Sequence, residues 1–451
     1  MVVHKTVICP TCGKKTDLRV QIGSYGDFDG TGNSAGHLDS YPIRIHCGKC
    51  RTLIKGKFIF SGNENPYGFH IENAKTEDKD VDLENFRAIN VDFVTEISGE
   101  LPCRKTKPNC GKFDDSPFMT SSIKMGGDEI CKWHRRLSSF SSDINEWHVN
   151  KNTPFQLLED GCIQFVPLTC KDWKECFFYS DDEEENSICY LQDIMRQEMQ
   201  YLLPHCSGDE DSYIHIALEI AAIEDKFGQE LYEFLERIGG RRGLIDAYRK
   251  TVSIFCSFMD IYPLVLPAEA YLRYKDKTDK EIGMSTCTFS DLKTFYFESY
   301  EKLLSLIYIP VCLDNISQRG SYSKYSSKIE RTLQKKENQS GTKDFLYLYQ
   351  EQDNGWRSDN YSSNEPLQRM INLHTNKNMR NGIVHATVEY DGMTQMITFY
   401  SLQNPPRISL RKSLIDFAVE CIGFAKSSVL LAETIQFLII REKILAEKYK
   451  K

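Results

Sequence analysis

The sequence predicts an α+β protein, with a small β-rich module at the N-terminus followed by a mainly α-helical region. Two Cys-x-x-Cys pairs among short β-rich runs indicate the module, and apolar residues spaced three and four apart indicate the helices. A chain of 451 residues with 41% hydrophobic content is long enough for two or three domains and a substantial core. We therefore divide it into residues 1–98, 99–188 and 189–451.

The charge balance argues against a protein that coats nucleic acid through bulk electrostatics. The formal net charge is −8, so any RNA contact must use local basic patches. Such clusters are more often solvated faces than nucleic-acid grooves. They occur at residues 104–107, 132–136, 241–242 and 335–336.

Neither a targeting segment nor a membrane span is expected from the sequence. No charged segment followed by an apolar core opens it. The most apolar stretch, residues 414–440, is interrupted by charged side chains, which suits a helix buried among protein neighbours. We therefore expect a cytoplasmic protein with no membrane partner.

The two Cys-x-x-Cys pairs have the spacing of metal-binding turns. Cys9 and Cys12 form the first pair, and Cys47 and Cys50 form the second. Four thiolates on two such turns can bind one tetrahedral Zn²⁺, which is the zinc-ribbon arrangement. Because sulfur would fill all four positions, we expect a structural Zn²⁺ and no catalytic metal.

The remainder of the module is predicted to be strands and one loop. A Gly-, Ser- and Asp-containing segment at residues 23–40 predicts a loop between the cysteine pairs. His37 and His46 are available as extra ligands, although four sulfurs suffice. The β-rich runs lie at residues 18–22, 43–46 and 53–60.

The middle region has short apolar runs and little periodicity. Cys103, Cys110, Cys131 and His134 supply four suitable ligands for a second zinc site. The first spacing is looser than usual for such a site, so scattered buried thiols are the alternative.

The helical region follows an acidic run at residues 181–185, where like charges predict a solvated loop. One of its helices, over residues 244–259, is expected to stop near Pro263 and Pro267. The polar segment 317–364 predicts a partly mobile insertion, with a lid or a substrate-contacting loop as alternatives. Further apolar stripes predict helices over residues 214–222, 227–238 and 292–304.

A candidate active site lies near the C-terminal end of the sequence, in the pattern Arg380-Asn381-x-x-x-His385. An arginine and a histidine five positions apart can loosely share one helical face. A guanidinium binds phosphate oxygens, and a neutral imidazole can take a proton from a ribose 2′-hydroxyl. This is the combination that metal-independent RNA cleavage needs. Asn381 adds a donor and an acceptor beside them.

A hairpin and a long apolar helix are predicted after this pattern. Two β-rich runs, residues 387–390 and 396–400, flank an Asp391-Gly392 turn signal. Arg369 and His374 have the same spacing as Arg380 and His385, so the spacing alone is not specific.

The motif, with the hairpin and helix that follow it, resembles the HEPN superfamily of helical ribonucleases over roughly residues 190–451. We prefer Arg380 and His385 because Asn381 follows the arginine directly. The resemblance implies a HEPN-like domain in which His385 is the general base or acid and Arg380 holds the scissile phosphate. It further implies that Asn381 orients the pair or hydrogen-bonds a phosphate oxygen. It implies 2′-hydroxyl attack that leaves a cyclic phosphate and a 5′-hydroxyl, without a metal. It also implies a homodimer, because such proteins place two motifs face to face.

Proteins of this kind are frequent in bacterial antiphage defence, where a toxic ribonuclease is held by an antitoxin or activated on infection. An antitoxin or activating protein is therefore a candidate partner. One alternative is a non-catalytic zinc-ribbon sensor or scaffold that dimerises through its helical domain. Another is a nucleic-acid-binding regulator that uses Lys14, Lys15 and Lys49 and binds with a steep salt dependence.

Overall fold

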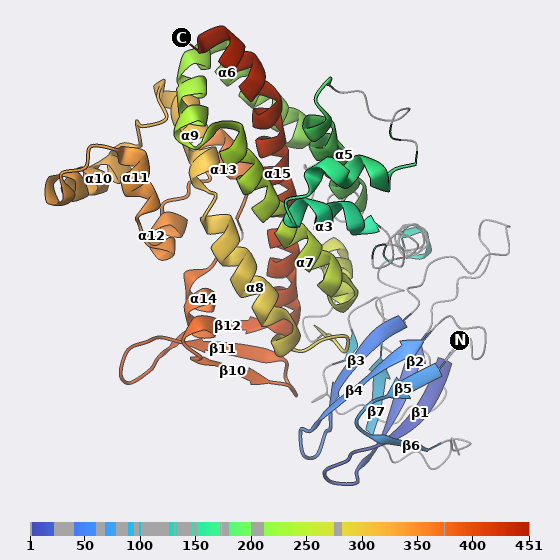
Figure 1. Ribbon diagram of the computed structural model, residues 1–451. Coiled ribbons are helices and arrows are strands. Elements are labelled where there is room, and N and C mark those ends of the chain that lie inside the picture. Colours follow the sequence, from blue (N-terminus) through green and yellow to red (C-terminus); the bar gives the residue numbers. More distant parts are fainter. Residues whose placement is uncertain are drawn as a thin grey trace. The chain divides into compact units, whose positions relative to one another are not determined.

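Figure 1 shows the computed structural model of the protein, which contains both sheets and helices and confirms the α+β class at that level. The chain forms two compact units, each made of three sequence segments. Unit 1 comprises Met1–Val149, Met259–Thr294 and Asn381–Ile422, and unit 2 comprises Asn150–Phe258, Phe295–Arg380 and Gly423–Lys451. The division at residues 98/99 and 188/189 stays a prediction. The structure describes residues 2–21, 40–59, 68–77, 89–93, 99–100, 126–129, 132, 144, 147, 151–171, 173, 180–199, 212–274, 282–373 and 375–450.

Unit 1 contains all the β-strands of the described chain. The first sheet has the order β6-β1-β2-β7, in which β1 and β2 are antiparallel and β2 and β7 are parallel. Its strands are β1 (Val2–Ile8), β2 (Lys15–Gln21), β6 (Lys75–Glu77) and β7 (Ile89–Phe93). A short pairing joins β8 (Gly99–Glu100) to β9 (Ile282–Gly283).

The second sheet of unit 1 is antiparallel and half-buried. Tyr41, Ile43 and Ile45 of β3 are buried in strict alternation, so one face of this strand packs on the core. The turns of the β1–β2 and β3–β4 hairpins carry the two cysteine pairs. The three predicted β-rich runs are confirmed. The strands are β3 (Ser40–His46), β4 (Leu53–Ile59) and β5 (Gly68–Ile71).

The third sheet of unit 1 follows the motif. The predicted hairpin is confirmed, with Asp391 opposite Met396 across the turn, and a third strand extends it. Phe289 packs beneath it, with ring centroids 6.3 Å from Phe399 and 5.1 Å from Phe417. The strands are β10 (Val388–Asp391), β11 (Met396–Tyr400) and β12 (Ile408–Ser413).

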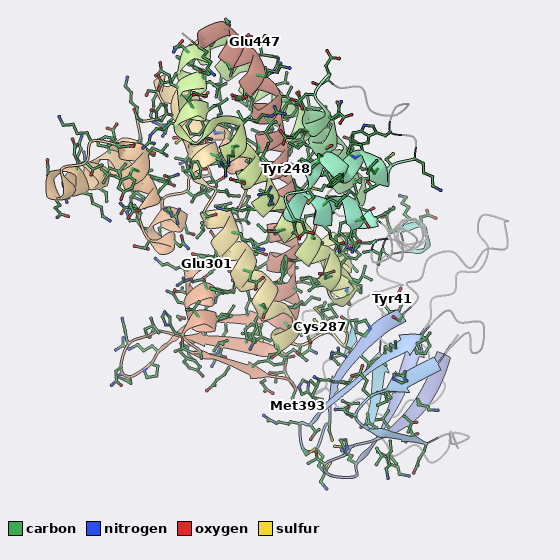
Figure 2. The ribbon with its side chains drawn as sticks, viewed as in Figure 1. Tyr41, Tyr248, Cys287, Glu301, Met393 and Glu447 are labelled. Carbon is green, nitrogen blue, oxygen red and sulfur yellow. The ribbon has the colours of Figure 1, made fainter. Side chains whose placement is uncertain are left out.

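Unit 2 is helical, and four helices, α7, α8, α14 and α15, contribute residues to both units. The buried Tyr248 of α7, labelled in Figure 2, donates its hydroxyl to Gln192 of α5. The described helices are α3 (Thr153–Glu159), η3 (Ile163–Thr169), α5 (Glu183–Met199), α6 (Ser212–Arg237), α7 (Gly240–Tyr274), α8 (Phe289–Leu304), α9 (Tyr308–Arg319), α10 (Ser327–Ser340), α11 (Phe345–Gln350), α12 (Asn354–Asp359), α13 (Pro366–Met370), α14 (Lys377–Val384) and α15 (Leu414–Tyr449).

The acidic run at residues 181–185 is not the solvated loop that its charge predicts. Its last three residues, 183–185, form the first turn of α5, and the Asp182 carboxylate just before the helix accepts the backbone N–H groups of Glu184 and Glu185. Arg241 pairs with both Asp182 and Glu184. Carboxylates are favoured at a helix N-terminus, and here a distant arginine relieves their mutual repulsion.

Helix α7 continues through Pro263 and Pro267, so the predicted stop near these residues is wrong. An interior proline costs about 3 kcal/mol because it removes a backbone hydrogen bond. The neighbouring Tyr262, Val265 and Leu266 are at most 2% exposed. Burying each such side chain contributes roughly 1.5–3 kcal/mol, so the three together offset the cost of the two prolines.

The polar segment 317–364 is ordered as α10, α11 and α12, in contrast to the mobile insertion predicted from its composition. A small core that includes Val311 of α9 holds these helices, and within it the Tyr325 and Tyr349 rings stack with their centroids 5.3 Å apart. The buried members are Val311, Tyr325, Ile329, Leu333, Leu348 and Tyr349.

Among the described residues, one helical stretch, Gly240–Leu272 of α7, is long and apolar enough to cross a membrane. Of its most apolar window, 61% is buried inside the protein. Length and composition alone do not separate a membrane span from a core helix.

Candidate functional site

The four cysteines of the N-terminal module come together in one cluster. Their Sγ atoms all lie within 4.8 Å of one another. The Sγ–Sγ distance is 3.4 Å between Cys9 and Cys50 and 3.7 Å between Cys12 and Cys47. Four sulfurs bonded to a tetrahedral Zn²⁺ at about 2.3 Å lie about 3.8 Å apart, so the cluster has the right size for such an ion.

The two cysteine turns have the same backbone geometry. Gly13 donates its N–H to the Cys9 carbonyl at 3.0 Å, and Arg51 donates to the Cys47 carbonyl at 2.9 Å. Both donors have left-handed backbones, with φ of 68° for Gly13 and 63° for Arg51. Glycine adopts this conformation freely and arginine does not, so the second turn is the more strained of the two.

The electrostatics of the cluster favour a bound cation. Hydrogen bonding with the Thr52 hydroxyl and backbone lowers the pKa of the Cys50 thiol to about 6. The Lys14 backbone lowers the pKa of Cys12, but burial and the neighbouring thiols outweigh it and raise this pKa to about 11. Closely spaced thiols cannot all ionise together unless a positive charge joins them. These residues could therefore hold a metal ion.

Of the other predicted metal ligands, His46 is not part of the cysteine cluster, and the rest lie outside the described residues. Among the described residues, the cluster that could hold a metal contains four cysteines and no histidine. His46 instead places its ring 6.1 Å from that of Tyr390 in β10. His37 and the predicted second site of Cys103, Cys110, Cys131 and His134 lie outside the described residues.

The motif residues lie on α14 and at its end. Arg380 and Asn381 are half-buried within the helix, whereas His385 is exposed just after its last residue. The His385 N–H still donates to the Asn381 carbonyl at 2.9 Å, so the backbone remains helical up to the histidine.

A left-handed residue ends α14. Ala386 has a φ of 52°, and its N–H bonds the Ile383 carbonyl while the Thr387 N–H bonds the Gly382 carbonyl. This pair of bonds is a Schellman motif with His385 at the C-cap position. The small residue after the histidine therefore has a structural reason, because a bulkier side chain would increase the strain at this position.

The Arg380 side chain is held by a carboxylate from α8. Its Nε donates to Glu301 Oε1 at 2.7 Å, and the two side chains are 27% and 32% exposed. The other Glu301 oxygen accepts from the Asn354 amide, which in turn accepts from Arg357. Figure 2 labels Glu301 on α8 within unit 2. The guanidinium is therefore oriented by a network of polar side chains.

Sequence reasoning missed Glu301, because it precedes Arg380 by 79 positions and has no recognisable motif around it. The competing arginine, Arg369, lies exposed on α13, and its partner His374 lies outside the described residues. Of the lysines proposed for nucleic-acid binding, Lys15 already pairs with Glu77 at 2.5 Å.

No family model, curated protein or solved structure matches the chain.

Proposed function

We propose that the protein is a metal-independent endoribonuclease of the HEPN type. The observation that supports this proposal best is the geometry of α14, which orients the Arg380 guanidinium through Glu301 and leaves His385 exposed at the helix end. A guanidinium held by Glu301 and an accessible imidazole at the end of the same helix suit attack of a 2′-hydroxyl on the adjacent phosphate.

Each motif residue has a role in this reaction. His385 takes the proton from the 2′-hydroxyl or returns one to the leaving 5′-oxygen. Arg380 binds the scissile phosphate and offsets the negative charge that gathers on its oxygens. Asn381 orients the pair or bonds a phosphate oxygen. The products are a 2′,3′-cyclic phosphate and a 5′-hydroxyl.

The assembly that we propose is a cytoplasmic homodimer that pools two motifs. Exposed apolar side chains suited to such an interface occur at Val384, 41% exposed, and beyond β11 at Leu402, 59% exposed. We also propose that the cysteine cluster holds a structural Zn²⁺ and that the enzyme is a toxin or antiphage effector controlled by an antitoxin or activating protein.

A non-catalytic sensor or scaffold is the second candidate, and one observation favours it. Arg380 is paired with Glu301, as an arginine with a purely structural role would be. In a scaffold, substitution of either partner would change stability alone, whereas in an enzyme Arg380→Ala would also slow turnover.

The test is cleavage of a labelled total-RNA or tRNA pool in Mg²⁺-free buffer by zinc-loaded protein. EDTA is added at the start to inhibit contaminating metal nucleases, and the zinc content is checked afterwards. Arg380→Ala and His385→Ala are each expected to slow cleavage roughly 100- to 10,000-fold. Arg369→Ala and His215→Ala, at exposed positions elsewhere, are the matched controls.

Two results would reject the proposal. One is equal cleavage by the wild type and both motif variants, provided that all are folded. The other is an absence of cleavage by every protein together with an absence of His385-dependent toxicity in cells, which would leave the scaffold.

A further inference from the structure

The second cysteine turn of unit 1 lies directly against the turn of the β10–β11 hairpin. A Cβ atom on Gly392 would lie 2.4 Å from two atoms of the His46 ring and 2.6 Å from a third. A side chain at this position would require the His46 ring to shift, so the backbone of Gly392 and the ring of His46 are in close contact. His46 immediately precedes the metal-ligand candidate Cys47.

An ion pair and a ring contact join the same cysteine turn and hairpin. Arg51, which follows Cys50, places Nη1 3.7 Å from the Asp391 carboxylate. The Arg51 side chain is 70% exposed, so the pair contributes at most about 1 kcal/mol. The Tyr390 ring meets the His46 ring edge-on, with an interplanar angle of 65°.

A second connection joins the same two parts of unit 1 through residues 284 and 285. Arg44 of β3 donates its backbone N–H to the Ser285 carbonyl at 2.8 Å. The buried Gln395 amide, at the other end of the hairpin turn, accepts the Met284 N–H at 2.7 Å and donates to the Met284 carbonyl. Figure 2 labels Met393 within this turn.

The hairpin is in turn fixed to the end of α14. A Cβ atom on Gly382 would lie 2.6 Å from the Phe399 ring, so the helix and β11 are in close contact. Two hydrogen bonds join Thr387 and Tyr400. The Tyr400 N–H donates to the Thr387 carbonyl at 2.8 Å, and the Thr387 hydroxyl donates to the Tyr400 carbonyl at 3.1 Å. A displacement of the hairpin must therefore displace the C-cap of α14, where His385 lies.

We propose that the metal bound by the four cysteines is a positioning element for the motif, acting through His46 and Gly392 on the hairpin and thereby on His385. The coupling depends only on contacts inside unit 1 and does not require that the protein cleave RNA. Its consequence for His385 reactivity rests on the proposed function. Coupling between two sites is reciprocal, so a change in the hairpin must alter metal affinity.

The test uses this reciprocity and measures Zn²⁺ affinity of the full chain by competition with a chelator. Gly392→Ala is expected to weaken binding about 10-fold, since the new methyl group pushes His46 away from the hairpin. Gly68→Ala is the matched control in β5, because nothing lies within 4 Å of its Cβ position. We expect it to change affinity by less than about 2-fold.

A double variant separates the contact from general damage. His46→Ala removes the ring that the new methyl group would strike, so His46→Ala/Gly392→Ala should bind Zn²⁺ within about 3-fold of His46→Ala alone. If Gly392→Ala binds Zn²⁺ as tightly as the wild type and Gly68→Ala do, the coupling does not exist.

Hydrogen exchange of the wild-type protein provides a measurement that depends on no variant. Removal of Zn²⁺ should accelerate exchange of the amides in β10, β11 and the His385 C-cap, and leave those of α10 in unit 2 unchanged. Unchanged exchange of the hairpin amides after metal removal would overturn the proposal. Neither measurement uses RNA, so failure of the coupling is distinguishable from failure of the ribonuclease proposal.

Discussion

The cysteine cluster of unit 1 and the buried Glu433 of unit 2 both gather groups that can become negative, but in the described part of the chain only Glu433 has a cationic side chain, Arg196, bonded to it. Glu433, on α15, is 1% exposed, and both of its oxygens accept N–H groups of Arg196 on α5. Burial, hydrogen bonds and the neighbouring thiols shift the pKa values of Cys9, Cys12 and Cys50. No cationic side chain among the described residues contributes to these three pKa shifts. Unit 2 therefore contains the cation that pairs with Glu433, whereas the cysteine cluster could take a metal cation from solution.

This difference predicts that the two units respond to different treatments. Metal removal should destabilise the β1–β2 and β3–β4 hairpins that carry the cysteines and leave the helices of unit 2 intact. Changes of buried carboxylates should affect unit 2 and leave metal binding intact.

The largest expected effect is that of Cys47→Ser, which removes one thiolate from the cluster. A structural zinc site contributes apparent binding energies of about 10–16 kcal/mol in small zinc modules, so we expect loss of one metal equivalent and unfolding of the module. Thiolate-to-Co²⁺ charge-transfer absorption measures the site. Cys162→Ser, a half-buried cysteine outside the cluster, is the control. Full metal binding by Cys47→Ser would show that the cluster is not the metal site.

The next effect is that of Glu433→Ala, which removes the buried carboxylate that bonds the Arg196 guanidinium through both oxygens and leaves Asp193 as a remaining partner. Removal of one member of a buried pair typically costs about 3–5 kcal/mol, and chemical denaturation followed by far-UV circular dichroism measures it. Glu447→Ala on the same helix, at an exposed position labelled in Figure 2, should change stability by less than about 0.5 kcal/mol. If Glu433→Ala and Glu447→Ala lowered the free energy of unfolding equally, the pairing of Glu433 with Arg196 would not stabilise unit 2.

A smaller, pH-dependent effect is expected from Asp314 of α9. It is 1% exposed, and burial raises its pKa to about 6 although it accepts the Leu367 and Gln368 backbone N–H groups. Because the folded-state pKa lies above the ordinary value of 3.8, the folded state binds more protons between these values. The stabilisation is therefore complete below about pH 4 and is lost as the pH rises through about 6.

The change over this interval is up to about 3 kcal/mol, and Asp314→Asn should abolish it. Thiol protonation makes metal binding weaker as the pH falls, so the two units should respond to acid in opposite directions. Denaturant titrations from pH 4 to 7 compare wild type and variant. A pH dependence that persists in Asp314→Asn would assign it to another group.

The parts of this protein that could be predicted from the sequence are those encoded by a short, continuous stretch of residues. The two cysteine pairs and the Asp391-Gly392 hairpin are short patterns in which each residue type has one main use. Glu301 could not be predicted, because only the folded chain brings it to Arg380. The helical start of α5 was missed for the same reason, since Arg241 is distant in sequence from the acidic run that it pairs with.

The most direct test of the ribonuclease proposal compares three oligonucleotides of one sequence, made of RNA, 2′-O-methyl RNA and DNA, as substrates of the zinc-loaded protein in Mg²⁺-free buffer. We predict that only the RNA is cut, that its fragments end in 2′,3′-cyclic phosphate and 5′-hydroxyl, and that His385→Ala cuts it at least about 100-fold more slowly. Cleavage of the DNA or the 2′-O-methyl RNA, or equal cleavage of RNA by His385→Ala, would contradict a mechanism in which His385 activates the 2′-hydroxyl.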